Sequence, residues 1–305
     1  MRDNELPPGH RSGFVAIVGR PNVGKSTLLN NLVRYKVAIV THKPQTTRNR
    51  IVGIRTTENS QIVFVDTPGI HDSSKPLNRA MLDVVRKTIA DVDVILYMVD
   101  SRREQLDAEE RFTLEVVSRT NAPRILVPNK VDLVKKEELL PLIARFTEAV
   151  SFEEVVPISA LKGEGLETLM EVVTSHLPEG PRYYPPDQMS ELRERDIAAE
   201  IIREKIFLLT HREIPYSSAV VVEEFKEVPE RELLHIQATI HVEKNSQKGI
   251  IIGKGGSMLK KIGQTAREEL ERLFGAKVFL ELYVRVEKNW TRDPKALRKL
   301  GLLEQ

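Results

Sequence analysis

A glycine-rich fragment near the N-terminus has the residue types and spacing of a phosphate-binding loop. Residues Gly19 to Ser26 read Gly-Arg-Pro-Asn-Val-Gly-Lys-Ser, directly after the apolar run Phe14 to Val18 and directly before a helical pattern. Glycines let backbone N–H groups close around phosphate oxygens, and the N-terminus of the following helix adds a favourable dipole. In this motif Lys25 reaches the outer phosphates, and the Ser26 hydroxyl can ligate Mg²⁺. The fragment therefore predicts a nucleotide-binding domain.

A second fragment, Asn129 to Asp132, reads Asn-Lys-Val-Asp and distinguishes guanine from adenine. The Asp132 carboxylate can accept two hydrogen bonds, from N1–H and from the exocyclic amine of guanine, and adenine offers no such pair. Hydrogen bonds to charged groups contribute about 1.5–3 kcal/mol each, so losing both would weaken binding by about two orders of magnitude or more. Further on, Ser159, Ala160 and Leu161 follow a predicted strand and would place a backbone N–H against guanine O6. In chain order with the phosphate loop, these fragments predict GTP and GDP as ligands.

Between the two fragments, Asp66-Thr67-Pro68-Gly69 predicts the magnesium and γ-phosphate part of the site. The Asp66 carboxylate can hold a magnesium-bound water, and the Gly69 N–H can sense a γ-phosphate. Either Thr46 or Thr47 can supply the second magnesium hydroxyl, and we favour Thr47. Such a loop is ordered by the γ-phosphate and released on hydrolysis, unless it is only a surface loop with two threonines. The predicted switch residues are Gln45, Thr46, Thr47, Arg48 and Asn49.

These fragments together define the predicted nucleotide site. Its Mg²⁺ ligands are Ser26, Thr47 and, through a water molecule, Asp66. The predicted nucleotide-binding residues are Gly19, Asn22, Val23, Gly24, Lys25, Ser26, Thr27, Asp66, Thr67, Pro68, Gly69, Asn129, Lys130, Asp132, Ser159, Ala160 and Leu161.

One position in the site predicts slow hydrolysis. In small signalling GTPases a glutamine after Asp-x-x-Gly orients the attacking water, but here that position is Ile70, which can neither donate nor accept a hydrogen bond. Even with the glutamine, the unassisted rate is only about 10⁻⁴ to 10⁻³ s⁻¹. No catalytic residue is therefore assigned, although Lys25, Thr47 and Gly69 would support hydrolysis. In the phosphate loop, Asn22 is either a ligand for K⁺, which would neutralise transition-state charge, or a structural residue.

A second glycine-rich fragment, Gly253 to Gly256, lies between an apolar segment and a helical pattern. A Gly-x-x-Gly turn lets about four nucleotides approach the main chain closely, as in KH modules, and single-stranded RNA is the natural ligand because duplex RNA is read mainly by shape. The absence of interleaved aromatic residues argues against a module that stacks bases on an exposed sheet. The alternative is a turn without a ligand. The predicted RNA-binding residues are Lys248, Gly249, Ile252, Gly253, Lys254, Gly255, Gly256, Lys260 and Lys261.

Composition limits the class of protein. With 305 residues, 41% of them apolar and 30% charged, the chain is expected to form two globular domains. It contains no cysteine, which excludes disulfides and thiolate metal sites. The N-terminus lacks the apolar stretch of a secretory signal, and no apolar run reaches the ~20 residues that span a bilayer, so a cytoplasmic protein is expected. The stretches 34–55 and 244–261 carry basic residues and no acid, as solvated faces or as parts of the two sites.

The order of predicted elements indicates two different architectures. Up to residue 177, short β-branched runs alternate with amphipathic stretches, which is typical of an α/β domain with a doubly wound sheet; its last strand is predicted at Glu154–Ile158. The later part has the order α-β-β-α-α-β, and Trp290 is expected to pack the tail rather than to stack on bases. The predicted divisions are a flexible tail (1–13), the nucleotide-binding domain (14–177), a proline-rich linker (178–190) and an α+β RNA-binding domain with the C-terminal tail (191–305).

The combination of fragments resembles the bacterial Era family of GTPases over nearly the whole chain. The fragments that carry the resemblance are GRPNVGKS, PQTTR at Pro44 to Arg48, DTPG, NKVD, SAL and GIIIGKGG at Gly249 to Gly256. The resemblance implies a P-loop GTPase domain followed by a type II KH domain, which binds the 3′ end of small-subunit (16S) ribosomal RNA. It also implies a role in rRNA processing and 30S subunit biogenesis, and peripheral association with the inner membrane. A monomer is expected.

Three classes of function stay open at this stage. The leading one is a GTP-gated RNA-binding assembly factor. The second is a signalling GTPase that acts through a protein or membrane partner, for example in cell cycle regulation, with the RNA-binding domain auxiliary. The third is a metabolic P-loop enzyme with a fused RNA-binding module. Replacing Lys254 and Gly255 with aspartate separates the first two, and Asp132→Asn tests the guanine assignment against the third.

Overall fold

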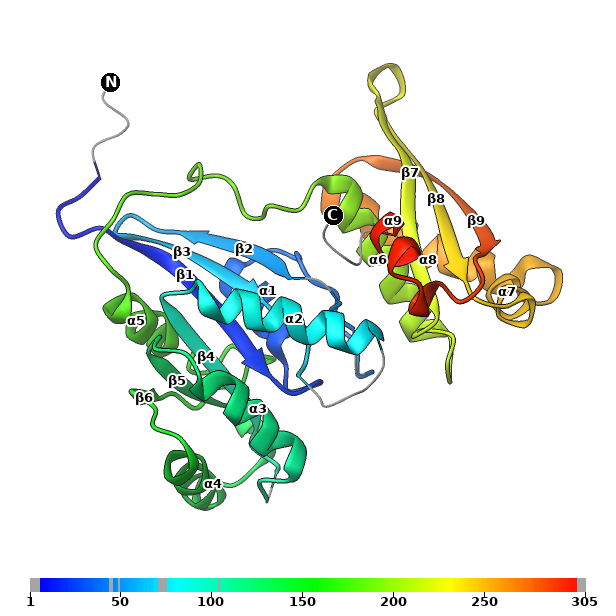
Figure 1. Cartoon of the computed structure of the whole chain (residues 1–305). Helices are drawn as coiled ribbons and strands as arrows, with labels where there is room; N and C mark the ends of the chain where they lie inside the picture. Colours follow the sequence, from blue (N-terminus) through cyan, green and yellow to red (C-terminus); the bar gives the residue numbers. More distant parts are fainter. Residues whose placement is uncertain (1–5, 44–45, 49, 71–75, 104, 301–305) are drawn as a thin grey trace. The chain divides into compact units, whose positions relative to one another are not determined.

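The computed structural model describes residues 6–43, 46–48, 50–70, 76–103 and 105–300. These residues form two compact units (Figure 1). The second unit takes residues 192–300 together with the short segments 39–46 and 76–77, and the first unit takes the rest. The segment 39–46, which precedes Thr47, is therefore grouped with the C-terminal half of the chain rather than with the nucleotide-binding fragments.

The first unit is built on a six-stranded sheet with the strand order β2-β3-β1-β4-β5-β6. Strands β2 and β3 are antiparallel, and the other neighbours are parallel. The strands are β1 (Arg11–Gly19), β2 (Ile51–Thr56), β3 (Ser60–Asp66), β4 (Val94–Asp100), β5 (Arg124–Asn129) and β6 (Glu154–Val155). The helices are α1 (Lys25–Val33), α2 (Pro76–Ala90), α3 (Ala108–Ser118), α4 (Lys136–Ala149) and α5 (Leu166–His176). In a parallel sheet of this kind, ligands bind beyond the carboxyl ends of the strands.

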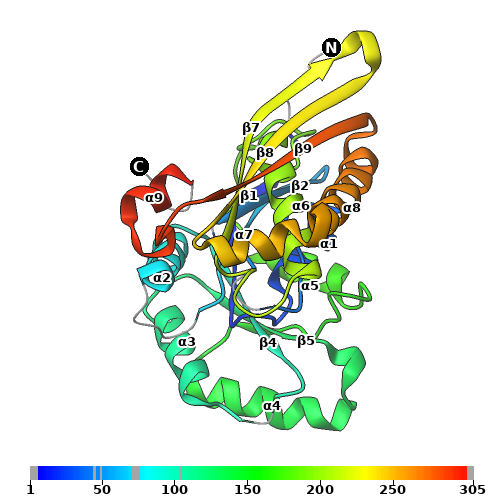
Figure 2. The same ribbon diagram turned by 90° about the vertical axis from the view of Figure 1, so that its right-hand side faces the viewer.

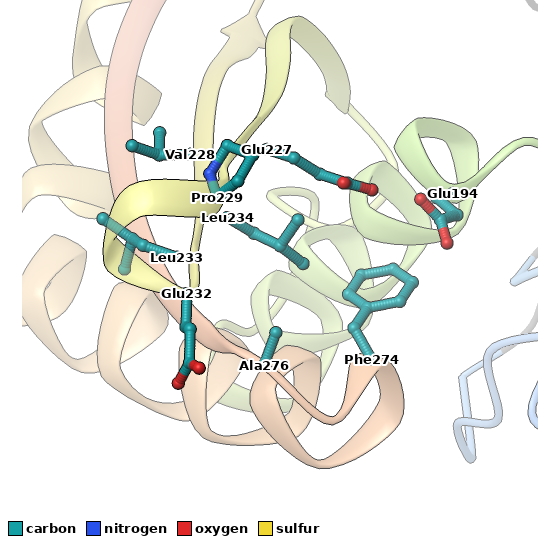
Figure 3. Close-up of a pocket in the computed structure, with 9 residues that line it drawn as sticks. All are labelled: Glu194, Glu227, Val228, Pro229, Glu232, Leu233, Leu234, Phe274 and Ala276. Atoms are coloured by element: carbon teal, nitrogen blue, oxygen red, sulfur yellow. The ribbon is translucent and has the colours of Figure 1, made fainter.

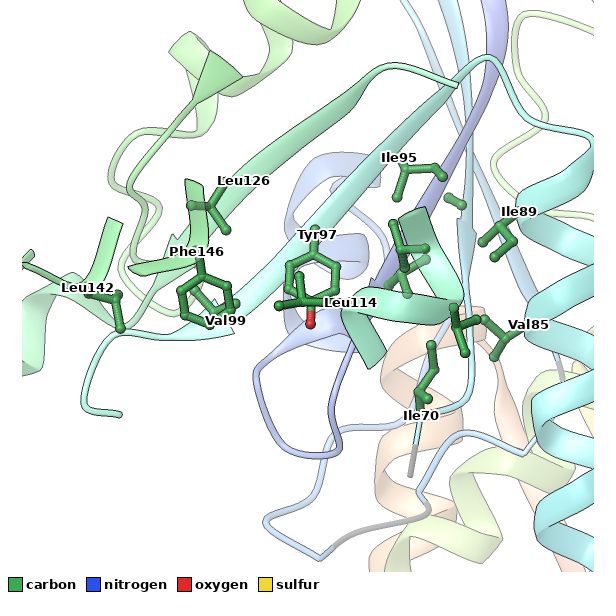
Figure 4. Close-up of a cluster of buried hydrophobic side chains, with 14 residues drawn as sticks. Ile70, Val85, Ile89, Ile95, Tyr97, Val99, Leu114, Leu126, Leu142 and Phe146 are labelled. Atoms are coloured by element: carbon green, nitrogen blue, oxygen red, sulfur yellow. The ribbon is translucent and has the colours of Figure 1, made fainter. Parts of the chain in front are cut away.

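The strands of this sheet are buried on both faces. On β1, Ala16 and Val18 join one apolar cluster, while Val15 and Ile17 point to the other face and are equally buried. Figure 4 shows this cluster, to which β4 contributes Tyr97 and α3 and α4 contribute further apolar side chains. The burial on both faces explains why β1 and β4 read as continuous apolar runs.

The last strand of the sheet is shorter than predicted. The sequence pattern indicates a strand over Glu154–Ile158, whereas β6 covers Glu154–Val155 and Ile158 makes only an isolated bridge to Asn129. Hydrogen bonds to β5 nevertheless continue past Val155, because the N–H groups of Val156 and Ile158 donate to the carbonyls of Leu126 and Pro128 at 2.9 and 2.8 Å. Pro157, between them, occupies a position whose N–H would face away from β5, where an edge strand tolerates proline.

The proline-rich segment 178–190 lies along the first unit. The backbone N–H groups of Tyr183 and Tyr184 both donate to Gln61 Oε1, at 2.7 and 2.9 Å. Ser190 Oγ donates to the carbonyl of Val52 at 2.6 Å. The segment predicted as a linker is thus hydrogen-bonded to the edge strand β2 and to its neighbour β3.

The second unit contains a three-stranded sheet with the order β7-β8-β9. Figure 2 shows its strands side by side, with β7 and β8 forming a long hairpin. The strands are β7 (Ser218–Val228), β8 (Leu233–Val242) and β9 (Lys277–Val286), and β9 runs parallel to β8. The helices are α6 (Glu194–Leu209), α7 (Asn245–Ile252), α8 (Ser257–Phe274) and α9 (Pro294–Lys299). The order from α6 to β9 is the predicted α-β-β-α-α-β.

The core of the second unit follows the periodicities of its elements. On α8, Ile262, Ala266 and Leu270 recur every four residues and are fully buried, so they form one face of the helix. Trp290, which follows β9, is fully buried and donates its indole N–H to the Ser217 carbonyl at 3.2 Å. Trp290 is therefore a packing residue, as expected, and is not exposed for base stacking. Among the described residues, no helix is both long and apolar enough to cross a bilayer.

Candidate functional site

The phosphate loop, residues Gly19 to Ser26, connects β1 to α1 at the carboxyl end of the sheet. Gly24 is the N-cap of α1 with φ 106°, a left-handed conformation that glycine adopts without steric cost. A Cβ at this position would lie 2.3 Å from Asn129 Nδ2, so space also requires glycine. The loop therefore presents the N-terminus of α1 together with its backbone, as an anion site requires.

The ammonium group of Lys25 is held inside this loop. Its Nζ donates to the carbonyls of Gly19 at 2.9 Å and Arg20 at 2.8 Å, and the side chain is buried. Burial lowers the pKa of Lys25 from 10.5 to about 8, and the nearby carboxylates of Asp66 and Glu110 oppose that change. A phosphate group would favour the charged form of this lysine, as expected for a phosphate ligand.

Three oxygen-bearing side chains from distant parts of the sequence form a hydroxyl–carboxylate cluster. Ser26 Oγ donates to Asp66 Oδ2 at 2.7 Å and lies 2.9 Å from Thr47 Oγ1, which is 3.3 Å from the same carboxylate oxygen. Asp66 is fully buried, and its Oδ1 has no hydrogen-bond partner among the described residues. Burial raises the pKa of Asp66 to about 6, against the opposing effects of Lys25, Ser26 and Thr47. A buried carboxylate with an unsatisfied oxygen beside two hydroxyls fits a hard cation such as Mg²⁺.

The structure separates the two candidate switch threonines. Thr46 Oγ1 hydrogen-bonds to the Lys43 carbonyl at 2.7 Å and to Thr41 Oγ1 at 2.7 Å, whereas Thr47 joins the hydroxyl–carboxylate cluster. Thr46 belongs to the second unit and Thr47 to the first. This geometry favours Thr47 as the metal ligand. Of the other predicted switch residues, Arg48 is buried, and Gln45 and Asn49 lie outside the described residues.

The side chain of Asn129 ties three loops together. Its Nδ2 donates to the Val23 carbonyl at 2.7 Å, and its Oδ1 accepts from the Ala160 N–H at 2.8 Å. One backbone N–H of Ser159, Ala160 and Leu161 is predicted to face guanine O6, and that of Ala160 is engaged by Asn129. The next residue, Lys130, donates to the Asn22 carbonyl at 2.8 Å and to Asp100 Oδ2 at 2.7 Å. The phosphate loop and the base-recognition loops are held in one arrangement by these contacts.

The remaining predicted residues of the nucleotide site divide into supporting and open positions. Thr67 is fully buried and donates to the Ile17 carbonyl at 2.8 Å. Ser159 is also buried, and its Oγ accepts from the Lys162 N–H at 3.2 Å. Val23 and Pro68 are buried and Thr27 is half-buried. Asp132 and Leu161 are exposed, which leaves the base-recognition carboxylate open to a ligand.

Ile70 packs into the core instead of facing the site. Its side chain is 1% exposed and lies in the same cluster as Val85 (Figure 4). Its backbone N–H lies 3.3 Å from the Gly19 carbonyl. At Gly69, a Cβ would lie 2.7 Å from the ring of Pro21, so the backbone of this segment passes directly against the phosphate loop. The side chain at the glutamine position is therefore directed away from any attacking water.

The phosphate loop is braced by a group of charged residues that no sequence motif predicted. Arg20 hydrogen-bonds to Asp107 at 2.6 Å and forms an ion pair with Glu109, both at the start of α3. Glu110 is buried and accepts from Tyr97 Oη at 2.5 Å. Burial raises the pKa of Glu110, and Tyr97 and Arg20 oppose that change. The spacing Asp107-x-x-Glu110, typical of a helix N-terminus, is the signal that could have located this anchor.

The Gly-x-x-Gly turn, residues Gly253 to Gly256, joins α7 to α8 in the second unit. Gly255 and Gly256 have φ values of 59° and 80°, and no heavy atom lies within 4 Å of a Cβ placed on either residue. The same open space surrounds Gly249, one turn of helix earlier. The main chain of the turn is therefore accessible to a ligand that approaches closely, as the backbone of single-stranded RNA does in KH modules.

Lysines surround this turn. Lys254, Lys260 and Lys261 are exposed and Lys248 is half-buried, and none of the four forms an ion pair with a carboxylate in the described part of the chain. Ile252 is half-buried at the end of α7. A row of unpaired cations beside an open glycine turn favours a phosphate backbone as ligand.

The fold and the two sites define a P-loop GTPase with a C-terminal KH domain. A family model described as "50S ribosome-binding GTPase" matches residues 14–130, and a KH domain model matches residues 213–291. GTPase Era of Syntrophus aciditrophicus is 54% identical over 294 residues, 96% of each chain. GTPase Era of Geotalea uraniireducens is 53% identical over 291 residues, 95% of this chain and 97% of the relative.

Two solved structures are similar over nearly the whole chain. A variant of Aquifex aeolicus Era bound to GDP and AlF₄⁻ superposes with a TM-score of 0.92 at 41% identity, covering 96% of this chain and all of that one. Era in complex with MgGDPNP and nucleotides 1506–1542 of 16S ribosomal RNA also has a TM-score of 0.92 at 41% identity, over 97% of this chain and all of that one. The chain belongs to the Era family of GTPases. The predicted fold class and family resemblance are confirmed.

Proposed function

We propose that this GTPase binds the 3′ end of 16S ribosomal RNA and acts in rRNA processing and maturation of the 30S subunit. The observation that carries the proposal is the open Gly-x-x-Gly turn with its unpaired lysines, Lys254, Lys260 and Lys261. A similar protein, 41% identical over 97% of this chain, binds nucleotides 1506–1542 of 16S ribosomal RNA together with MgGDPNP. The "50S" description of the matching family model concerns residues 14–130 alone, so it does not bear on the KH domain.

At the nucleotide, Lys25 and the backbone of the phosphate loop would hold the phosphates, and Asp132 would select guanine. Ser26 and Thr47 would ligate Mg²⁺ directly, and Asp66 would do so through a water molecule. The unsatisfied, buried Asp66 Oδ1 supports this assignment. The bound Mg²⁺ would neutralise charge on the phosphate oxygens, and the residues of this chain would position the nucleotide and the ion.

Control of the second unit by the nucleotide would pass through the peptide bond between Thr46 and Thr47. Within the second unit, residues 39–43 are held to the C-terminal part of α6: Val40 N–H donates to Glu204 at 3.0 Å, and Lys43 Nζ donates to the carbonyls of Phe207 and Thr210. A γ-phosphate and Mg²⁺ that draw Thr47 into their coordination would act on this segment and so on α6.

This coupling is tested with Lys43→Met, which keeps the aliphatic stem of the side chain and removes its donor. RNA affinity is measured with the protein loaded with GDP or with a non-hydrolysable GTP analogue. We expect a smaller difference between the two states than in the wild type. The exposed Lys226, on β7, provides the matched control Lys226→Met, which should leave the difference unchanged. An unchanged difference in Lys43→Met as well would refute the coupling.

Hydrolysis is expected to be slow without a partner, because the buried Ile70 cannot orient water. Asn22, in the phosphate loop with φ 64°, is proposed as a ligand for K⁺ during hydrolysis. Single-turnover hydrolysis measured in potassium and in sodium buffers tests this role. Equal rates in the two buffers would remove K⁺ from the mechanism.

The RNA target is tested by crosslinking in cells. The wild-type protein, loaded with a non-hydrolysable GTP analogue or with GDP, is crosslinked to total cellular RNA, and the bound RNA is sequenced. We expect a footprint at the 3′ end of 16S rRNA that is enriched with the GTP analogue. A footprint elsewhere, or recovery of the protein only with membranes, would instead favour the signalling alternative.

A pair of matched variants assigns that footprint to the KH turn. Lys254→Asp with Gly255→Asp reverses charge at the turn, and aspartate tolerates the positive φ at residue 255 better than most residues. Lys277→Asp with Gly275→Asp makes the same changes at another open, positive-φ glycine, at the far end of α8. The first pair of substitutions should abolish RNA binding and preserve GTP binding, and the control pair should preserve both. Cytoplasmic localisation, a monomeric state and peripheral membrane contact stay predictions.

A further inference from the structure

A pocket lies within the KH unit, at the end opposite the Gly-x-x-Gly turn. Its volume is about 270 Å³, and its inner wall includes Leu234, Phe274 and Ala276 (Figure 3). Glu194, Glu227 and Glu232 line its outer part and are exposed. This glutamate-rimmed pocket is formed by the start of α6, the turn between β7 and β8, and the end of α8.

The walls of the pocket are held in place by contacts outside it. Arg195, in the first turn of α6, donates to the Val222 carbonyl on β7. The ring of Phe274 packs edge-on against Phe225, with 5.8 Å between ring centroids and an interplanar angle of 83°. Val278 N–H donates to Glu271 Oε1 at 3.1 Å and fixes the chain as it leaves α8. The pocket is therefore preformed and would not pay an ordering cost when occupied.

The charged residues that line this pocket have one sign. All three charged residues that line it are glutamates, and none of them forms an ion pair within the described ranges. The hairpin stretch 223–232 carries five acidic and two basic residues. The C-terminal end of α8, which also borders the pocket, contributes the negative end of a helix dipole. The pocket thus attracts cations and repels phosphate groups.

The rest of the same unit has the opposite character. The stretch 244–261, with the Gly-x-x-Gly turn, has five lysines and no acid. The 18 residues of α8 separate this turn from Phe274, a rise of about 27 Å at ~1.5 Å per residue. The roughly four nucleotides that such a turn contacts would therefore leave the pocket free.

We propose that the glutamate-rimmed pocket is a docking site for a positively charged segment of a protein partner, which inserts one apolar side chain. The volume lies below the range of roughly 300–1,000 Å³ typical of small-molecule sites and suits a single side chain. The apolar inner wall receives that side chain, and Glu194, Glu227 and Glu232 pair with flanking lysines or arginines. The KH unit would then hold RNA at one end and a basic protein segment at the other.

The test uses a fluorescein-labelled peptide, Arg-Lys-Leu-Arg-Lys, with the full-length protein. Two further probes are Arg-Lys-Ser-Arg-Lys, which lacks the apolar anchor, and the acidic Glu-Asp-Leu-Glu-Asp. Anisotropy is measured near 0.15 M salt, where screening over about 8 Å suppresses distant charge effects. The leucine peptide should bind about tenfold more tightly than the serine peptide, because it buries an apolar side chain. The acidic peptide should not bind.

Two variants and a matched control locate the binding. Glu194→Lys with Glu227→Lys reverses the rim, and Ala276→Phe fills the interior without a change of charge. Each variant should bind the leucine peptide about tenfold or more weakly than the wild type does. Glu223→Lys with Glu230→Lys makes the same change of charge at exposed positions of the hairpin that do not line the pocket, and should change affinity less than about twofold.

Methyl NMR provides an independent readout. The leucine peptide should shift the methyl signals of Leu233 and Leu234 and leave those of Ile251, next to the Gly-x-x-Gly turn, in place. Equal affinity for the leucine and serine peptides would overturn the proposal, as would equal weakening in the control variant. Shifts of Leu233 and Leu234 caused by a single-stranded RNA oligonucleotide would assign the pocket to RNA and overturn it as well.

Discussion

Replacing Asn129 with alanine should destabilise the first unit and, through it, weaken nucleotide binding. The side chain is 2% exposed, donates to Val23 and accepts from Ala160 at 2.7 and 2.8 Å. Alanine would leave the Val23 carbonyl and the Ala160 N–H without these partners. Each buried unsatisfied group costs about 1–3 kcal/mol, so we expect a loss of about 2–6 kcal/mol in the free energy of unfolding of this unit.

The assay must separate the two units, because two-state analysis does not apply to the whole chain. The chain has one tryptophan, Trp290, in the second unit, so its fluorescence reports that unit alone. Hydrogen exchange of peptides from β5 and α1, followed by mass spectrometry in increasing urea, reports the first unit. In Asn129→Ala, exchange of the first-unit peptides should begin at lower urea than in the wild type, and the urea midpoint of the Trp290 fluorescence transition should not change. Asn121→Ala, an exposed position in the same unit, is the control and should shift neither.

A double-mutant cycle tests the reasoning further. A Cβ at Gly24 would lie 2.3 Å from Asn129 Nδ2, so Gly24→Ala should cost less in the Asn129→Ala background than in the wild type. The strain of φ 106° would persist in both backgrounds. The contrary result is that Asn129→Ala weakens GDP binding while the free energy of unfolding of the first unit, measured by exchange, stays within about 1 kcal/mol of wild type. That result would make Asn129 a direct ligand rather than a structural residue and would refute the reasoning.

Three further predictions concern single residues. Asp132→Asn should weaken GTP binding by about two orders of magnitude and shift preference to xanthine nucleotides, measured by competition with a fluorescent GDP; unchanged GTP affinity would end the base assignment. Trp290→Phe should lower the free energy of unfolding of the second unit by about 1–3 kcal/mol, because the Ser217 carbonyl loses its buried donor. Circular dichroism follows the unfolding, and an unchanged free energy would contradict the buried position of Trp290. Burial lowers the pKa of His241 below 6.5, and Glu287 opposes that change. As pH falls through 6.5, the histidine of the unfolded chain therefore takes up a proton before that of the folded chain does. The second unit should lose stability between pH 6.5 and the lower pKa of folded His241, which urea unfolding followed by Trp290 fluorescence can measure. His241→Gln should flatten that dependence, and a stability that rises on acidification would contradict the sign.

Part of the site could be predicted because its chemistry lies in contiguous fragments. The phosphate loop needs only a strand, a glycine-rich turn and a helix in succession, and the local sequence pattern predicts all three between Phe14 and Val33. The Gly-x-x-Gly turn is local in the same sense. Local preference conflicts with tertiary context in helix α4, which contains Pro141, a residue that weakens any helical pattern.

The sequence by itself determined which nucleotide is bound and which modules are joined, since residue types at fixed spacing specify hydrogen-bonding chemistry and local backbone shape. Only the tertiary structure decided which side chains meet. Ser26, Thr47 and Asp66 converge from positions 21 and 40 residues apart, and this convergence separates Thr47 from Thr46. It also decided that Ile70 is buried and that the glutamates of the KH unit surround a pocket. Such contacts depend on how strands and helices pack over long sequence separations, which no single fragment encodes.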